Sequence, residues 1–499
     1  METQNTNNQD KSAYRSIFKA TSLFGGVQVF NILIQIVKQK FIAILLGPTG
    51  MGISGLYTSA TQLIQGLTSM GLSSSAVKNV AEANGSGDFQ RISRVVTVLR
   101  KLVWITGLLG MIVVIVLSPI LSKSTFGNYD YTIPFIFLSV TLLFQQLSAG
   151  QSVVLRGMRR LRHMAKSSVL GSFFGLIISV PIYYFFGIDG IIPTLILSSI
   201  TTLLLTWYFS RKIKIEKQKI TTKQTFGEGK EMLKMGLVMS LNSILVLGVA
   251  YIVRIFIVRI GGTEEVGLYT AGFAIINTYV GLIFASLGTD FYPRLASVNK
   301  DNNKCRDLVN NQSEINLLLL PPMLILFIVF APFIVQLLYS SEFIPITSFM
   351  QWAMLGIVFQ ALSWSISYQF MAKADMKIYA INETIKNIIV LLLNVFGYLL
   401  WGLDGLGIAF TISYLFYFIQ VLIVSKIKYN FFFRKDSVKL FIITSLLIVS
   451  VFLSVFLINN YLKYIIESFL FLLSLIYSYR ELNKRMALKE LFKNRINNK

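Results

Sequence analysis

The sequence has almost none of the residues on which disulfide, metal and nucleophile chemistry depends. Cys305 is its only cysteine and His163 its only histidine. We therefore expect no disulfide, no Cys/His metal site and no catalytic Cys-His or Ser-His-Asp arrangement within one chain. No G-x-x-x-x-G-K-[ST] motif occurs, so ATP is not expected as the direct energy source, and no cofactor is predicted.

The sequence is also poor in charge and in long polar connections. Only 14% of its residues are charged and 54% are hydrophobic, whereas about 25% are charged in average soluble chains. A 499-residue chain of this composition has more apolar surface than one soluble core can bury. Lipid is therefore the expected solvent, and no extramembrane domain large enough to hold a sugar donor is visible.

Long apolar runs account for most of the chain. A span needs about 20 mainly apolar residues to cross the hydrocarbon layer. The first 15 residues are polar and resemble no cleaved signal peptide. We expect an all-α integral membrane protein with about fourteen spans: 22–46, 53–77, 102–121, 132–155, 167–187, 190–209, 235–260, 266–290, 315–339, 347–371, 378–401, 405–425, 439–458 and 462–479.

An internal repeat divides the chain. A run with Lys40 passes through a Gly-containing turn to the residues GLYT at 55–58, and a run with Arg254 does the same before GLYT at 267–270. GIDG at 187–190 is repeated as GLDG at 402–405. Membrane repeats of this kind are typical of secondary transporters with a site between the halves. We expect a six-helix lobe over 1–210, a basic linker over 211–234, a second six-helix lobe over 235–426, and two extra helices with a basic tail over 427–499.

The distribution of Lys and Arg predicts the orientation. With the N-terminus in the cytoplasm, most of the 46 basic residues lie in cytoplasmic segments, as the positive-inside rule requires. Both termini are then cytoplasmic, in a bacterial inner membrane. The net charge of +23 is explained by topology and anionic lipid, and no nucleic acid is expected as a partner.

Polar residues inside the spans are the candidate site. Charges at the bilayer centre usually face a cavity or a partner, and Lys38, Lys40, Arg254 and Lys386 fall within spans. Gln28, Asn31, Gln35 and Lys38 share one helix face by their spacing. Similar stripes include Gln62 and Gln65 in the second span and Glu383, Lys386 and Asn394 in the eleventh.

Each of these residues has a structural alternative. Amides in membrane helices often only hydrogen-bond to neighbouring helices. Lys40 lies opposite Lys38 on the helix wheel and can extend toward the membrane surface. The repeat pairs Arg254 with Lys40, whereas the polar stripe favours Lys38. Glu383 and Lys386, three residues apart, can form an ion pair with each other.

Three segments resemble a known family. They are GLSSSAVKNVAE at 71–82, LGTDFYPRL at 287–295, and ALSWSI at 361–366 leading to Ala372-Lys373. In order and spacing they are similar to the O-antigen flippases, the Wzx-type polysaccharide translocases of the multidrug/oligosaccharidyl-lipid/polysaccharide exporter superfamily, which include lipid III flippases. The resemblance covers the first twelve spans.

The resemblance implies a transporter rather than an enzyme. It implies two six-helix lobes around a cavity and the transfer of an undecaprenyl-diphosphate-linked oligosaccharide to the outer leaflet, with polysaccharide polymerase and chain-length proteins as partners. The expected diphosphate contacts are Lys38, Arg254, Lys40 and Lys386. The expected glycan contacts are Gln28, Asn31, Gln35, Gln62, Gln65 and Asn394.

Ion coupling and substrate class leave alternatives open. Proton or sodium antiport needs a carboxylate, for which Glu383 and then Asp290 are the candidates. A lipid II flippase for peptidoglycan or a multidrug exporter of the same fold would have the same helices, although cationic stripes disfavour the exporter. A membrane polymerase is the remaining alternative, and its catalytic residues cannot be nominated from the scattered acidic residues outside the spans.

Overall fold

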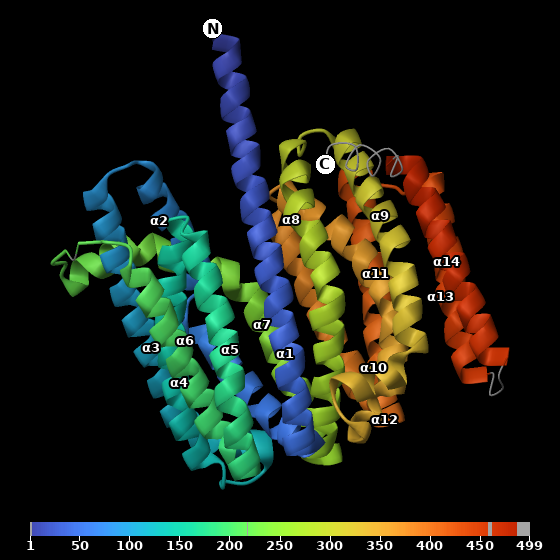
Figure 1. Ribbon diagram of the computed structural model, residues 1–499, viewed down its shortest axis with the longest axis horizontal. Helices are drawn as coiled ribbons and strands as arrows, with labels where there is room; N and C mark the ends of the chain where they lie inside the picture. Colours follow the sequence, from blue (N-terminus) through green and yellow to red (C-terminus); the bar gives the residue numbers. More distant parts are fainter. Residues whose placement is uncertain (1, 217, 458–461, 487–499) are drawn as a thin grey trace. The chain divides into compact units, whose positions relative to one another are not determined.

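The computed structural model describes residues 2–216, 218–457 and 462–486, and helices with short connections make up this part of the chain (Figure 1). Side chains are described from residue 26 onward, except at 279–280, 282–283, 285–289 and 486. The elements are α1 (Glu2–Thr68), α2 (Leu72–Gly85), α3 (Phe89–Phe126), α4 (Thr132–Gly157), α5 (Leu161–Phe186), η1 (Gly187–Gly190), α6 (Ile191–Arg211), α7 (Thr222–Ile275), η2 (Ile276–Val280), α8 (Gly281–Ser297), α9 (Asn302–Val329), α10 (Ala331–Leu338), η3 (Ser341–Phe343), α11 (Ile346–Ala372), α12 (Met376–Tyr429), α13 (Lys435–Leu457) and α14 (Leu462–Met486).

Ten helices within the described residues are long and apolar enough to cross a membrane. Four of them are 43 to 57 residues long, about twice the length that one crossing requires. Each of these four contains a backbone break, at Gly47 in α1, at η1 between α5 and α6, at Gly262 in α7 and at Trp401–Gly402 in α12. The expected all-α membrane protein is confirmed, and the count of fourteen spans stays a prediction.

The breaks repeat along the chain with one constant offset. Gly47 and Gly262 have φ of 61° and 83° with extended ψ, and Gly187 and Gly402 have φ of 53° and 57° with ψ near −130°. Only glycine adopts these conformations readily. Both pairs are 215 positions apart (47 to 262 and 187 to 402). The backbone therefore carries the repeat that the sequence predicts.

By internal compactness the chain divides into two units, Met1–Gly267 and Leu268–Lys499. This division uses a different criterion from the repeat, so the predicted lobe limits at 210 and 235 stay a prediction. The predicted basic tail lies mostly outside the described residues. Unit 1 includes most of α7, and a close backbone contact attaches that helix to it. A Cβ placed on Gly71 would lie 2.1 Å from the carbonyl oxygen of Gly236.

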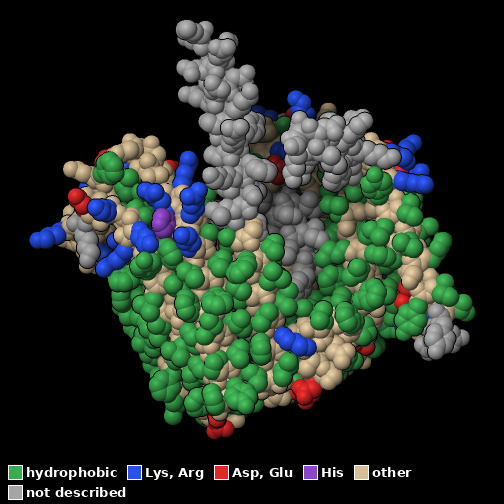
Figure 2. All heavy atoms as spheres, in the orientation of Figure 1, with side chains coloured by type: hydrophobic (Ala, Val, Ile, Leu, Met, Phe, Trp, Pro, Cys, Tyr) green, Lys and Arg blue, Asp and Glu red, His purple; other side chains and the backbone are tan. Residues whose placement is uncertain are grey.

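In unit 1, α3 packs against α4, α4 packs against α6, and α5 packs against both α6 and α1. The inner faces are apolar, as the buried residues Leu99, Phe135 and Val154 illustrate. The outer faces are apolar too: Phe137 is 58% exposed and Phe186 is 65% exposed. Figure 2 shows this apolar flank, with Lys and Arg side chains gathered at one end of it. This pattern is expected of helices that are surrounded by lipid.

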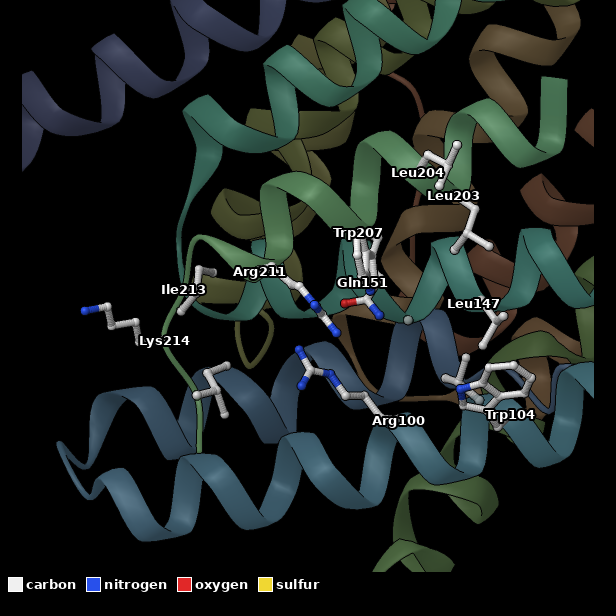
Figure 3. Close-up of a pocket in the computed structure, with 13 residues that line it drawn as sticks. Arg100, Trp104, Leu147, Gln151, Leu203, Leu204, Trp207, Arg211, Ile213 and Lys214 are labelled. Atoms are coloured by element: carbon white, nitrogen blue, oxygen red, sulfur yellow. The ribbon is translucent and has the colours of Figure 1, made fainter. Parts of the chain in front are cut away.

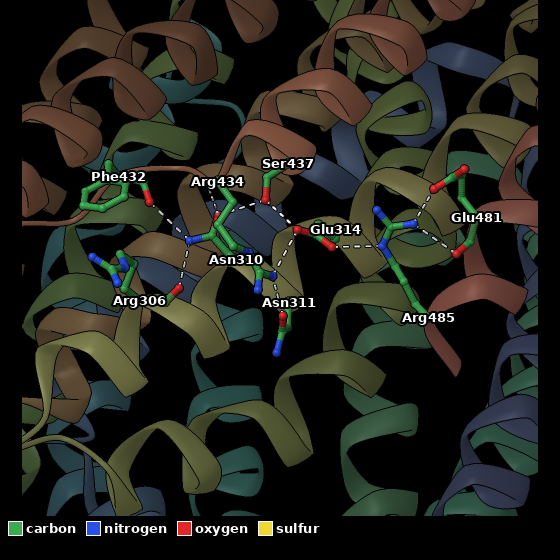
Figure 4. A network of polar contacts seen from close by, with 9 residues as sticks. All are labelled: Arg306, Asn310, Asn311, Glu314, Phe432, Arg434, Ser437, Glu481 and Arg485. Atoms are coloured by element: carbon green, nitrogen blue, oxygen red, sulfur yellow. Dashed lines mark hydrogen bonds and ion pairs between the residues drawn. The ribbon is translucent and has the colours of Figure 1, made fainter. Parts of the chain in front are cut away.

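In unit 2, α11 packs against both halves of α12, and α9 packs against α11, α13 and α14. A polar network attaches the last two helices (Figure 4). The buried Glu314 on α9 pairs with Arg434 before α13 and with Arg485 on α14, each at 3.0 Å, and accepts a hydrogen bond from Ser437 at 2.7 Å. Ion pairs therefore attach the C-terminal helix pair to α9, and the pair covers one side of that helix.

Candidate functional site

Unit 1 contains a polar cavity between α1, α4, α5 and α6, which we call the N cavity. It consists of a hollow of about 570 Å³ and an adjoining hollow of about 400 Å³ that shares Arg156 and several Ser and Thr hydroxyls with the first. Lys38, Gln35 and Asn31 line it from α1. The hydroxyl groups that line it are those of Ser54, Ser73, Ser148, Ser152, Ser167, Ser168, Ser172, Tyr183, Thr194, Ser198, Ser199, Thr202 and Thr206.

The charge in the N cavity has one sign. Lys38 and Arg156 are its two cations, and no Asp or Glu is among the described residues that line it. Asn31 donates a hydrogen bond to the hydroxyl of Ser168 at 2.9 Å, which attaches α1 to α5. A cavity with two cations, amides and many hydroxyls is suited to an anion that also carries hydroxyl groups.

The polar stripe of the first span is only partly inside this cavity. Asn31, Gln35 and Lys38 line the N cavity, whereas the exposed Gln28, one turn earlier, does not. Gln62, which is exposed, and Gln65, which is half-buried, lie after the break at Gly47 and are not among the lining residues either. The break changes the direction of α1, so the two stripes do not form one continuous face.

Unit 2 contains a smaller cavity of about 310 Å³ between α11 and the two halves of α12, which we call the C cavity. Glu383 and Lys386 form an ion pair at 2.5 Å in its wall, with side chains 9% and 14% exposed. Tyr417 donates a hydrogen bond to the same carboxylate at 2.5 Å. The alternative of an ion pair within the eleventh span is therefore confirmed, and the charge of Lys386 is already balanced.

The two cavities occupy equivalent places in the repeat. Each residue that lines the C cavity falls, 215 positions earlier (for example 383 to 168), on a residue that lines the N cavity. The pairs are Gln360 with Gln145, Ser363 with Ser148, Trp364 with Ala149, Ser367 with Ser152, Tyr368 with Val153, Met371 with Arg156, Tyr379 with Met164, Glu383 with Ser168, Lys386 with Gly171, Tyr414 with Ser199, and Tyr417 with Thr202.

The same offset also identifies the residue of the first half that corresponds to Arg254. Moved back by 215 positions (254 to 39), Arg254 corresponds to Gln39, which lies between the two lysines and lines the N cavity. Arg254 is half-buried on α7 and donates a hydrogen bond to the carbonyl of Ala250 at 3.0 Å. Lys40 is half-buried and does not line the cavity.

The remaining predicted residues lie apart from both cavities. Asn394 is 3% exposed and donates a hydrogen bond to the carbonyl of Val390 at 2.7 Å. Asp290 is 68% exposed and pairs with Arg294 at 2.6 Å. Asn394 and Asp290 were predicted from the sequence as site residues, but neither lines the N cavity or the C cavity.

The structure adds residues that sequence reasoning missed. Arg156 belongs to the last turn of α4 and lines the N cavity, although hydropathy placed it in a loop. The hydroxyls on α6 recur every fourth residue, at 194, 198, 202 and 206, and Ser148, Ser152 and Arg156 do the same on α4. This spacing puts them on one helix face, so the signal was present in the sequence.

Comparison with known proteins identifies the family to which this chain belongs. Residues 41–348, which include most of the N cavity, match the model of the family described as polysaccharide biosynthesis protein. The chain belongs to this family. The predicted resemblance to a family of polysaccharide biosynthesis is thereby confirmed.

Individual relatives of this polysaccharide biosynthesis protein are distant but cover most of the chain. The lipid III flippase of Escherichia coli strain K12 is 23% identical over 416 residues, covering 81% of this chain and 96% of the flippase. The solved structure of the lipid II flippase MurJ, inward closed, aligns with a TM-score of 0.69 and 14% identity over 93% of this chain and 99% of that one. An inward-facing MATE transporter of the MOP superfamily has a TM-score of 0.67 and 16% identity, over 80% and 94%.

These similarities establish the fold of the polysaccharide biosynthesis protein. It is a multi-pass membrane protein with the fold of MOP-superfamily transporters, and the prediction of a transporter rather than an enzyme agrees with that fold.

Proposed function

We propose that this protein is a flippase that moves an undecaprenyl-diphosphate-linked oligosaccharide from the cytoplasmic to the periplasmic leaflet. The observation that carries the proposal is the N cavity, in which Lys38 and Arg156 face hydroxyl and amide groups without a lining carboxylate. Phosphate oxygens form their strongest hydrogen bonds with cationic donors. The lipid III flippase relative supports the same substrate class.

In this proposal the diphosphate binds Lys38 and Arg156, while Asn31, Gln35 and Gln39 contact the sugars. The sequence also predicts that Lys40 and Arg254 contact the diphosphate and that Gln28, Gln62, Gln65 and Asn394 contact the glycan. These contacts stay predictions, and the proposed N cavity site does not depend on them, because none of these residues lines that cavity. We assign Lys386 to its ion pair with Glu383 instead of to the substrate.

The proposed topology has fourteen crossings with both termini in the cytoplasm of a bacterial inner membrane. The four broken long helices support it, because each is long enough for two crossings. The repeated break positions support two related halves that alternate access to the substrate. Polysaccharide polymerase and chain-length proteins would receive the product.

We further propose that transport is coupled to an ion through Glu383. It is 7% exposed and balanced by a single lysine, so its protonation would remove the charge that holds Lys386 and the hydroxyl of Tyr417. Asp290 is the weaker candidate, since its carboxylate is largely exposed and paired with Arg294.

A multidrug exporter of the same fold is disfavoured by the N cavity. Organic cations would need carboxylates or aromatic faces, whereas the charged groups in that cavity are cations. A lipid II flippase shares the diphosphate carrier with the proposed substrate and differs from it in the glycan. A transport assay with both lipids therefore separates these two functions.

The test is transport by the purified protein in liposomes that contain a fluorescent undecaprenyl-diphosphate oligosaccharide. The fluorescence of lipid that reaches the opposite leaflet is quenched by a membrane-impermeant reagent. We expect transfer by the wild-type protein, and a loss of at least about tenfold in the Lys38→Gln, Arg156→Gln double variant, because a charge-assisted hydrogen bond contributes about 1.5–3 kcal/mol.

Lys304→Gln is the matched control, since its side chain is 71% exposed in unit 2. Equal transfer by the double variant and this control would contradict the proposed site. Equal transfer of a peptidoglycan precursor would favour the lipid II function, and transfer of neither lipid would contradict the proposed function altogether.

A further inference from the structure

A second cationic pocket lies on the outside of unit 1, apart from the N cavity. It has a volume of about 590 Å³ and is formed by α3, α4, the end of α6 and the following connection. Arg100 and Arg211 point toward each other across it, and the amide of Gln151 lies beside the end of Arg211 (Figure 3). Lys214 adds a third cation at one end of the pocket.

The two arginines lack an acidic partner in this pocket. No Asp or Glu is among the described residues that line it, and the Nε atom of Arg100 is buried without a hydrogen-bond acceptor. Arg211 lies over the ring of Trp207 at 4.1 Å. Two like charges held close together at a partly buried site are unfavourable without an anion between them, so the two arginines favour the binding of an anion.

The remaining side chains that line this pocket are mostly apolar, and several of them are exposed. Trp104 is 50% exposed, Leu204 is 57% exposed and Trp207 is 41% exposed. The cations lie at the helix ends that the Lys and Arg distribution assigns to the cytoplasm, and the apolar residues continue from there along the spans. A tryptophan at the boundary between polar and apolar surface is typical of the membrane interface.

The equivalent side of unit 2 indicates what covers this pocket. α3 and α9 begin at the equivalent N-cap residues Asp88 and Asp301, 213 positions apart (88 to 301). With this offset, Arg100 and Trp104 correspond to Ser313 and Leu317, which are 0% and 3% exposed. They lie on either side of Glu314, the residue of α9 that pairs with Arg434 before α13 and with Arg485 on α14.

In unit 2 a helix pair covers this position, whereas in unit 1 no described helix does. The occupant in unit 1 has to supply both apolar surface and negative charge, because the pocket presents exposed apolar residues and unbalanced cations.

We infer that this pocket binds an anionic phospholipid of the inner leaflet. Its phosphate would lie between Arg100 and Arg211, in reach of Gln151, and its acyl chains would lie along Trp104, Leu203 and Leu204. Arginine suits this role because its guanidinium group donates to two phosphate oxygens at once. The lipid fills in unit 1 the place that the C-terminal helices fill in unit 2.

The test uses native mass spectrometry of the full-length protein with phosphatidylglycerol or phosphatidylcholine of identical acyl chains. We expect the wild-type protein to retain one phosphatidylglycerol at least about tenfold more tightly than phosphatidylcholine, from two charge-assisted contacts. Arg100→Gln with Arg211→Gln should remove the preference. Arg91→Gln, an exposed arginine on the same helix, should keep it.

A second measurement uses phosphatidylglycerol with brominated acyl chains, which quench nearby tryptophans. Quenching should fall strongly in Trp104→Phe with Trp207→Phe, because both indoles line the pocket. An unchanged lipid preference in the arginine double variant would overturn the inference. So would displacement of the lipid by inorganic phosphate alone, or occupation of this face by a second copy of the chain, seen as a dimer that excludes lipid.

Discussion

The N cavity and the C cavity are lined by equivalent positions of the repeat but differ in charge. Cations face the N cavity with no carboxylate among its described lining residues, whereas an ion pair lies in the wall of the C cavity. Ser168, Gly171 and Thr202 line the first, where Glu383, Lys386 and Tyr417 line the second. The larger side chains reduce the C cavity and balance its charge internally. The smaller ones leave the N cavity open, with two cations facing it. One repeated scaffold therefore forms a larger cavity lined by two cations in unit 1 and a smaller cavity lined by an ion pair in unit 2.

The cost of membrane charge explains why this difference matters. A cation at the centre of a bilayer costs about 2.5–3.5 kcal/mol on insertion scales. In the C cavity the ion pair at 2.5 Å offsets that cost. In the N cavity the half-buried Lys38 has no carboxylate among the described lining residues, so this cavity is the better candidate for binding an anionic substrate.

The largest expected effect comes from placing the acidic residue of the C cavity into the N cavity. Ser168→Glu introduces a carboxylate at the position equivalent to Glu383. It should repel the diphosphate and pair with the cations, lowering transport by more than about tenfold. The measurement is transfer of lipid-linked oligosaccharide in liposomes.

Ser168→Gln is the control for this change, because it also loses the hydrogen bond from Asn31 and adds similar volume without charge. It should keep most of the transport. If Glu and Gln at position 168 reduce transport equally, steric filling and not charge explains the effect, and the electrostatic difference between the cavities has no functional meaning.

The second effect is on stability and not on the transport rate, and it should follow from breaking the ion pair of the C cavity. Lys386→Gln leaves the buried Glu383 without its cation, which should destabilise the protein by about 3–5 kcal/mol. Glu383→Gln together with Lys386→Gln removes both charges and should recover most of this loss. Thermal unfolding in detergent measures these two variants together with Glu383→Gln, which completes a double-mutant cycle.

Independent, additive losses in that cycle would mean that the two side chains do not stabilise each other. In that case Lys386 would again be a cation available to the substrate. The comparison between an internally balanced cavity and an open one would then be wrong for unit 2.

The smallest expected effect concerns ion coupling. A gradient of one pH unit is worth about 1.4 kcal/mol per proton, enough to change the transport rate several-fold if Glu383 carries the proton. Glu383→Gln should transport at a rate that no longer responds to the gradient, since the neutral amide cannot titrate. An unchanged response in this variant would exclude Glu383 as the coupling residue, and Asp290→Asn would be tested next.

The sequence predicted the repeat and the Gly-containing turns, because glycine is required where the backbone adopts the angles of Gly47 and Gly402. It left Lys40 and Lys38 as alternative counterparts of Arg254 (254 to 40 and 254 to 38), whereas the backbone breaks pair Arg254 with Gln39, between them. The four-residue GLYT echo is offset by 212 positions (55 to 267), whereas the breaks are offset by 215. A short match of letters fixes register less well than a backbone break does.

The candidate site was predicted only in part. Asn31, Gln35 and Lys38 were found because amides and a lysine stand out in an apolar helix. The Ser and Thr faces of α4 and α6 were missed, since hydroxyls in membrane helices usually bond to their own backbone. Arg156 was missed because a hydropathy criterion ends the predicted span before the first charged residue, at 155. The helix α4 continues to Gly157 and carries Arg156 in its last turn.

The most direct test of the central claim is equilibrium binding of undecaprenyl diphosphate, without glycan, to the purified protein in nanodiscs. The account predicts that Lys38→Gln with Arg156→Gln weakens binding at least about tenfold, while Glu383→Gln with Lys386→Gln changes it by less than about twofold. The reverse order, with the C cavity variant losing the ligand and the N cavity variant keeping it, would contradict the account.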